Sequence, residues 1–173
     1  MASPHRPILP ITVSLSPLVA PQIPSADARP SFLVKVTLTN TADVTLVILK
    51  WWTPFVHGAP AMGIFKVTDS WGSAVPDMGL SIDYLFPEDN TFVLQKGEGS
   101  NHNLLLIKPG ESVSQEVEIG DPEVLVKKGK RYSVKAKGIW MAVWKGEDAN
   151  GRYPMKDAIK SGHFESETVE VQT

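Results

Sequence analysis

Short stretches in which apolar and polar side chains alternate, separated by turn residues, constrain this chain more than any other feature. In residues 32–38 and again in residues 132–136, every second side chain is apolar. A period of two places the apolar side chains on one face of a half-buried β-strand. Turn signals stand between such stretches, as at Asn40-Thr41-Ala42-Asp43 and at Pro109-Gly110. The pattern predicts an all-β protein, an immunoglobulin-like antiparallel β-sandwich of about eight or nine strands.

Further strands are expected at residues 64–69, 82–84, 92–94, 103–107, 113–119 and 165–171, and one helical turn at residues 154–160. Residues 44–49 are apolar on both faces, which predicts a central strand. Residues 113–119 carry acidic side chains on the outer face, and residues 131–137 carry basic ones. We expect these two strands to pair as a hairpin, with about 0.2–1 kcal/mol from each cross-strand charge pair.

The N-terminal 30 residues hold seven of the 14 prolines. Proline cannot donate a ladder hydrogen bond, so it is confined to edge strands or loops. We therefore predict a proline-rich arm over residues 1–30, with an edge strand at residues 11–15, and one β-sandwich domain over residues 31–173.

The composition narrows the class of partner. A net charge of −2 argues against nucleic acid, and no apolar stretch approaches the roughly 20 residues that span a bilayer. The chain has no cysteine, which excludes disulfides, thiolate metal sites and a cysteine nucleophile. Pro4, Pro7 and Pro10 interrupt the position where a signal peptide would be apolar. These features predict a cytoplasmic protein, with secretion after processing as the alternative.

No arrangement typical of catalysis is found in the sequence. The histidines stand at positions 5, 57, 102 and 163, without the HExxH spacing of zinc peptidases, and no GxSxG motif is present. The run Asp148-Ala149-Asn150-Gly151 matches part of a calcium loop, but it also suits a tight Asn-Gly turn, which we favour. We predict no enzyme activity, no metal site and no cofactor.

Tryptophans are the most informative candidates for binding. Trp51 and Trp52 are neighbours, so their rings should point to opposite faces of a strand, whereas Trp140 and Trp144 should share one face. An exposed aromatic ring on a sheet can stack on a sugar or anchor a protein partner. Alternatively, both faces are covered, one by the opposing sheet and the other by a loop or the proline-rich arm.

The order of several segments adds a resemblance. Residues 35–41, 49–55, 65–69, 106–112, 129–134 and 137–138 follow one another as in the N-terminal propeptide-type domain of deuterolysin-like fungal metalloendopeptidases. The resemblance covers residues 32–140 and does not extend to the zinc protease domain, which the chain lacks. It implies a β-sandwich that binds a protein surface, with a peptidase as the partner, in the manner of a propeptide or an inhibitor.

Three hypotheses of function follow. The leading one is a non-catalytic protein-binding module whose loops at one end of the sandwich carry Trp52, Pro54, Phe55, His57 and Trp71. The second is a carbohydrate or small-ligand binder that uses Trp140, Trp144 and Tyr153. The third is a structural protein that forms a homodimer through an exposed sheet face.

Overall fold

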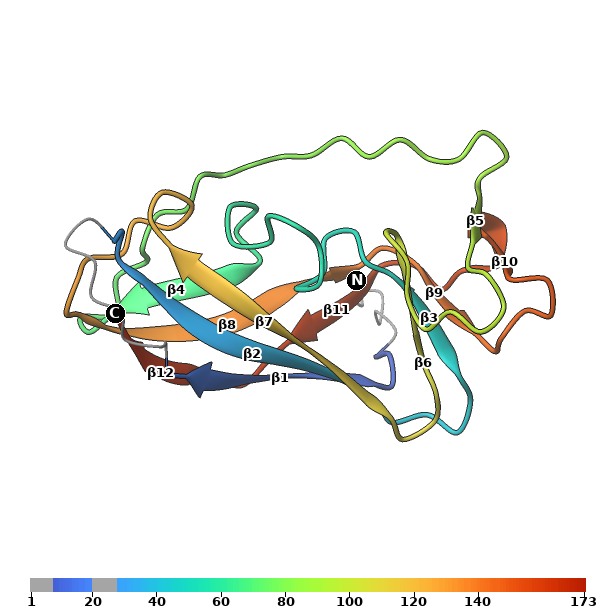
Figure 1. Cartoon of the computed structure of the whole chain (residues 1–173), viewed down its shortest axis with the longest axis horizontal. Helices are drawn as coiled ribbons and strands as arrows, with labels where there is room; N and C mark the ends of the chain where they lie inside the picture. Colours follow the sequence, from blue (N-terminus) through green and yellow to red (C-terminus); the bar gives the residue numbers. More distant parts are fainter. Residues whose placement is uncertain (1–7, 20–27) are drawn as a thin grey trace, which may run out of the picture.

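The computed structural model describes residues 8–19 and 28–173, and these residues form almost only antiparallel β-strands (Figure 1). The strands are β1 (Ile11–Leu18), β2 (Ser31–Asn40), β3 (Leu46–Leu49), β4 (Phe65–Asp69), β5 (Thr91–Val93), β6 (Leu104–Ile107), β7 (Ser112–Gly120), β8 (Arg131–Trp140), β9 (Val143–Lys145), β10 (Arg152–Pro154), β11 (Gly162–Glu165) and β12 (Val169–Gln172). A single helical turn, η1 (Met155–Asp157), falls within the range expected for one. The predicted all-β fold is confirmed. In the described part of the chain, no helix has the length and apolar character needed to cross a bilayer.

One layer of the sandwich is the sheet β1–β2–β7. β2 lies at its centre and pairs with β1 from Leu33 to Asn40 and with β7 from Ser31 to Thr39. Its inward side chains are fully buried, while hydroxyl pairs such as Thr37 Oγ1–Ser114 Oγ (2.8 Å) lie on the outer face. The alternation in the sequence therefore sorts core from solvent on this sheet. The edge strand expected at residues 11–15 is present as β1; residues 1–7 and 20–27 of the predicted arm lie outside the described residues.

The other layer is built around β8. One edge of β8 pairs with β4, and the opposite edge pairs with β12 near its start and with β11 near its end. Gly138 of β8 has no room for a side chain, because a Cβ there would lie 2.6 Å from Cζ of Phe164. The Phe164 ring crosses this glycine and packs against Trp140, with ring centroids 4.7 Å apart.

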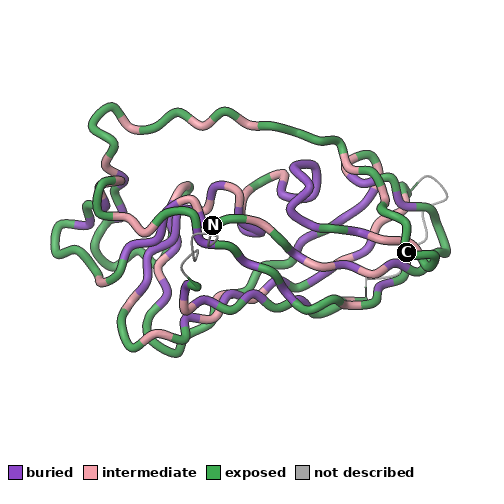
Figure 2. Tube along the Cα trace, turned by 180° about the vertical axis from the view of Figure 1, so that it is seen from behind, coloured by how far each residue is buried: buried purple, intermediate pink, exposed green. Residues whose placement is uncertain are grey.

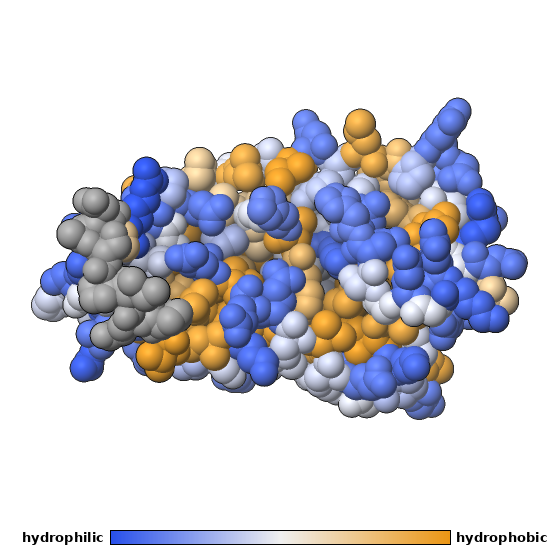
Figure 3. Space-filling model, in the orientation of Figure 1, coloured by the Kyte–Doolittle hydropathy of each residue, from blue (hydrophilic) through white to orange (hydrophobic). Residues whose placement is uncertain are grey.

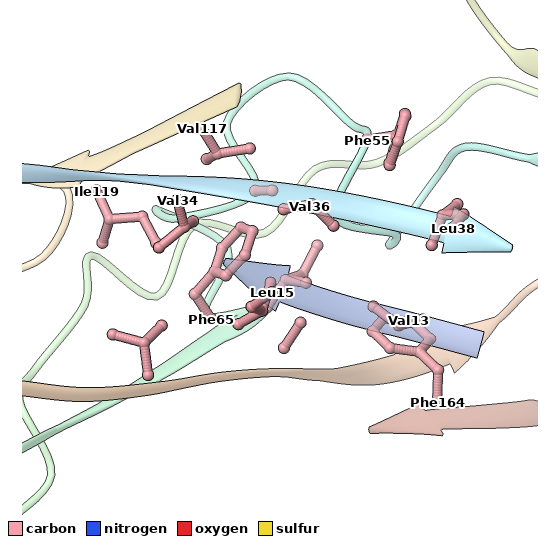
Figure 4. Close-up of a cluster of buried hydrophobic side chains, with 14 of the residues drawn as sticks. Val13, Leu15, Val34, Val36, Leu38, Phe55, Phe65, Val117, Ile119 and Phe164 are labelled. Carbon is pink, nitrogen blue, oxygen red and sulfur yellow. The ribbon is translucent and has the colours of Figure 1, made fainter. Parts of the chain in front are cut away.

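The main core lies between these two layers (Figure 4). Val34, Val36 and Leu38 of β2 approach Phe65 of β4 and Phe164 of β11, and all of these side chains are buried. Burying each such side chain stabilises the fold by about 1.5–3 kcal/mol. No disulfide contributes, since the chain has no cysteine.

A second cluster of buried side chains lies beyond the end of the main core. It is enclosed by the sheet β6–β3–β9 and by the ribbon β10–β5. All four residues of β3 are buried, as the apolar run predicts for a central strand. Trp51, Phe92, Trp144 and Tyr153 fill the cluster with their rings in contact. Trp144 Nε1 donates a hydrogen bond to the Pro154 carbonyl (2.8 Å), which satisfies its buried polar atom.

Three sequence expectations are wrong in detail. β7 does not form a hairpin with β8: it pairs with β2 in the opposite layer, where Lys35 faces Glu116. The lysines of β8 instead bind Glu165 of β11. Residues 82–84 form no strand, since nothing pairs with them. Trp140 and Trp144 do not share a face, because β8 ends at Trp140 and the two rings enter different clusters.

Candidate protein-binding surface

The predicted binding segment Trp52 to His57 follows β3 and folds back onto the core. Pro54 and Phe55 are buried, Trp52 is half-buried, and His57 is exposed. Trp52 has a φ of 59°, and the Thr53 hydroxyl donates to the Lys50 carbonyl (2.6 Å), so the chain turns at once after the strand. This segment packs the junction of the two clusters and offers little aromatic surface to a partner.

The residues predicted for sugar binding are also buried. Trp140 is 1%, Trp144 4% and Tyr153 3% exposed. Burial raises the pKa of the Tyr153 hydroxyl, which accepts a hydrogen bond from the Asp148 N–H (3.3 Å). Rings enclosed in this way cannot stack on a sugar, so the carbohydrate prediction is corrected for these residues. These three residues instead fit the alternative drawn from the sequence, in which both faces of the sheet are covered.

Trp71 is the predicted aromatic site residue that stands in solvent, with 90% of its surface exposed. It lies in the turn that follows β4. Asp69 Oδ1 accepts hydrogen bonds from the N–H groups of Trp71 and Ser73, both at 2.9 Å, and Gly72 takes a φ of 79°. The turn is therefore tightly held, while the indole ring projects from it without a covering element.

Two further exposed apolar side chains lie at the same end of the sandwich. Met78 is 59% and Leu125 54% exposed. Their segments are joined by hydrogen bonds from Met78 N–H to the Glu123 carbonyl (2.9 Å) and from Leu125 N–H to the Pro76 carbonyl (3.0 Å). The Trp71 turn is tied to them through Val75, whose N–H donates to Val67 of β4 (2.8 Å). We call Trp71, Met78 and Leu125 the end surface.

From the end surface a long segment runs to β5, and sequence reasoning did not identify it as a site. Residues 78–87 have no turn or bend, and they cross the length of the molecule on their own (Figure 1). We call residues 78–87 the strap. From residue 81 to residue 85 the strap alternates between exposed and half-buried, whereas residues 78–80 are all exposed (Figure 2). Figure 3 shows apolar side chains between hydrophilic ones along the edge that the strap follows. The large apolar side chains exposed along the strap are Leu85 at 91%, Met78 at 59%, Phe86 at 43% and Leu80 at 40%.

Two hollows on the surface of the described residues do not show an arrangement of side chains typical of catalysis. The larger, of about 460 Å³, lies between the β5 and β10 regions, where Arg152 pairs with Asp89 at 2.9 Å. The smaller, of about 310 Å³, is lined partly by Glu98, Glu147 and Asp148. Hydrogen bonds from the N–H groups of Arg152 and Asn150 lower the pKa of Asp148, as in a tight Asx turn. Among residues 8–19 and 28–173, no three His, Cys, Asp or Glu side chains gather into a metal-binding group.

Comparisons with known proteins place the fold but not the partner. A protein of Arthroderma benhamiae named "Uncharacterized secreted protein" is 28% identical over 143 residues, which cover 80% of this chain and 67% of that protein. A crystal structure of a structural genomics target aligns with 95% of this chain and 87% of its own, at a TM-score of 0.40 and 10% identity. The description of the relative from Arthroderma benhamiae does not mention a peptidase.

The relative from Arthroderma benhamiae overturns one expectation. The prediction of a cytoplasmic protein conflicts with a similar protein that is named as secreted, and it is corrected on that ground. The lack of cysteine misled the inference, because a sandwich with a core of this size needs no disulfide. Residues 22–173 match the model of an immunoglobulin-like domain, and the chain therefore belongs to that family.

Proposed function

We propose that this immunoglobulin-like domain is a secreted, non-catalytic module that binds another protein through its exposed loops. The observation that carries the proposal is Trp71, a large aromatic side chain that is 90% exposed on a turn fixed by Asp69. Tryptophan on a rigid turn gives a large contact area with little loss of conformational entropy, which is why it is enriched at the centres of interfaces.

The neighbours of Trp71 strengthen this proposal. A single exposed apolar residue needs no explanation, but three on segments that backbone hydrogen bonds join at one end of the sandwich favour a partner that binds there. A central tryptophan in such an interface contributes about 2 kcal/mol or more to binding. Met78 and Leu125 would then lie around it and exclude water.

Secretion is proposed from the relative of Arthroderma benhamiae, whose name describes it as secreted. A peptidase is proposed as the partner because the order of segments resembles that of propeptide-type domains. The homodimer remains a rival occupant of the same surface, and the experiment below separates the two.

The test is to recover proteins that bind the tagged full chain from the extracellular medium of its native source, and then to measure their affinity with purified components. Trp71→Ser should weaken binding at least about tenfold, which corresponds to about 1.4 kcal/mol. Val93→Ser is the matched control, because Val93 is a half-exposed apolar residue on β5, away from the end surface.

Equal loss of affinity in both variants would show that the end surface is not the contact. Light scattering that finds a dimer abolished by Trp71→Ser would assign the surface to a second copy of the chain. If no protein binds and the chain stays monomeric, the proposed function is wrong.

A further inference from the structure

Residues 81–86 of the strap run extended along the molecule (Figure 1), and no described strand pairs with them. In the described part of the chain, no hydrogen bond joins the N–H or carbonyl groups of residues 81–86 to another residue. Among residues 8–19 and 28–173, neither edge of this stretch therefore has a ladder partner over a length of about 20 Å. Natural proteins normally cover or charge such an edge, because it invites pairing with another chain.

Side chains, rather than backbone bonds, hold the strap in place. Ile82 packs on the main core, and Tyr84 contacts both clusters. The Tyr84 ring stacks on Trp51 with centroids 4.4 Å apart and planes at 11°, and the Phe86 ring meets the same indole edge-on at 5.2 Å. The even-numbered residues thus anchor the strap from below, and the backbone groups remain available.

The ends of the strap are also fixed. Leu80 N–H donates to the Ala61 carbonyl at 2.8 Å, and just beyond the other end the Met155 N–H donates to the Asn90 carbonyl at 2.9 Å. Pro87 disfavours the helical region for Phe86, which keeps the preceding residue extended. A segment anchored at both ends and from below has lost most of its conformational freedom before any partner binds, which lowers the entropic cost of binding.

The outer face presents one large apolar side chain. Ser81, Asp83 and Leu85 point away from the core, and Leu85 is 91% exposed. An extended backbone with open edges and a projecting apolar residue has the form of a substrate bound to an endopeptidase, which pairs with the backbone and encloses one side chain in a specificity pocket.

We propose that residues 81–86 of the strap enter the substrate cleft of an endopeptidase that selects a large apolar side chain, with Leu85 filling the specificity pocket. This inference rests on the proposed protein-binding function and names the class of partner and the segment in contact. Simple strand addition would need only one open edge and would leave Leu85 without a role. The cleft uses both the open backbone and the projecting leucine.

The probes are α-chymotrypsin, whose pocket is a hydrophobic slot, and trypsin, whose pocket takes a cation. The intact wild-type chain should inhibit chymotrypsin competitively, raising the apparent KM for a peptide substrate without changing kcat, and it should not inhibit trypsin. Leu85→Arg should weaken inhibition of chymotrypsin at least about tenfold and create inhibition of trypsin. Ile139→Arg makes a matched change at a 41% exposed residue of β8, outside both the end surface and the strap, and it should alter the inhibition of neither enzyme.

Because the Leu85 side chain is almost wholly in solvent, its replacement should leave the circular dichroism spectrum and the melting temperature unchanged. Three results would overturn the inference: no inhibition of chymotrypsin by the wild-type chain, inhibition that is indifferent to residue 85, or rapid cleavage after Leu85 without lasting inhibition. In each case, a partner recovered through Trp71 would still support the proposed function, so the two claims fail separately.

Discussion

At the residue scale, Asn40 shows how one buried polar side chain can hold several segments of the sandwich together. It is fully buried at the end of β2. Its Nδ2 donates to the carbonyls of Val44 (2.8 Å) and Ile107 (2.9 Å), and its Oδ1 accepts the Ala42 N–H (2.8 Å). One amide thereby joins β2, the following turn and β6.

Replacing this residue should be costly. Asn40→Ala leaves two carbonyl groups and one N–H without their partner, so we expect the free energy of unfolding to fall by about 3 kcal/mol. Urea denaturation of both proteins measures the difference. Thr39→Ala is the control, since its hydroxyl pair with Ser112 is exposed and its loss should cost less than about 1 kcal/mol. Equal effects from the two substitutions would contradict this role of Asn40.

The exposure of single residues was the least predictable property at this scale. The sequence predicts that one of Trp51 and Trp52 is buried and the other partly exposed. Trp51 is 4% exposed and Trp52 is half-buried, but both lie in the turn after β3 rather than on a strand. The sequence could not show that Trp144 is covered, because β10 reaches it only through the tertiary fold. Trp71 was predictable as a turn residue, whereas its lack of cover is visible only in the structure.

At the scale of elements, the charges on β8 are paired across the sheet with β11. Glu165 accepts a hydrogen bond from Lys135 Nζ (2.5 Å) and lies 3.6 Å from Lys137 Nζ. The hydrogen bond and charge of Lys135, followed by the charge of Lys137, lower the pKa of Glu165 below its ordinary 4.5. A lowered pKa in the folded state means that the ionised carboxylate favours folding.

This stabilisation should therefore depend on pH. It is fully present above about pH 4.5, the ordinary glutamate value, and it is lost as the pH falls below 4.5 through the lowered pKa of the folded state. The melting temperature of wild type should slightly exceed that of Glu165→Gln at pH 7 and low salt, and the gap should close in acid. Glu167→Gln, which removes the same charge beyond the end of β11, should show no such gap. A gap that widens below pH 4.5 would contradict the pairing.

The strap gives a second prediction for an element. Tyr84→Ser removes the ring that stacks on Trp51, so the strap should move more freely. We expect the ¹⁵N NMR order parameters of the Asp83 and Leu85 amides to fall from about 0.85 to below about 0.6. Leu85→Ser alters the next residue but removes only an exposed side chain, and the order parameters should stay high. Equal mobility in both variants would show that Tyr84 is not the anchor.

The sequence predicted where several strands lie, but it did not predict which strands pair with each other. Alternation identified β2 and the inward positions of β8, and the apolar run identified β3. Alternation says which face is buried but not which strand lies alongside, so complementary charges on β7 and β8 suggested a hairpin that does not form. The short strand expected at residues 82–84 lies in the strap, where no described strand pairs with it.

At the scale of the whole molecule, residues that stabilise the fold are distinct from residues that we propose bind a partner. The first kind make up the two clusters of buried side chains. Trp52 and Tyr84 contact both clusters and join them. Most of the aromatic residues are buried in this packing. Trp71, Leu85 and Leu125 are among the apolar loop residues that stay exposed. The sheets and their buried side chains stabilise the fold, whereas the end surface and the strap make the proposed contact with a partner.

Hydrogen–deuterium exchange of the full chain, alone and with its recovered partner, tests this account most directly. It predicts that the partner slows exchange at residues 69–86, which cover the Trp71 turn and the strap, and leaves β1 unchanged. Slower exchange confined to the outer face of β1, β2 and β7, with residues 69–86 unaffected, would contradict it.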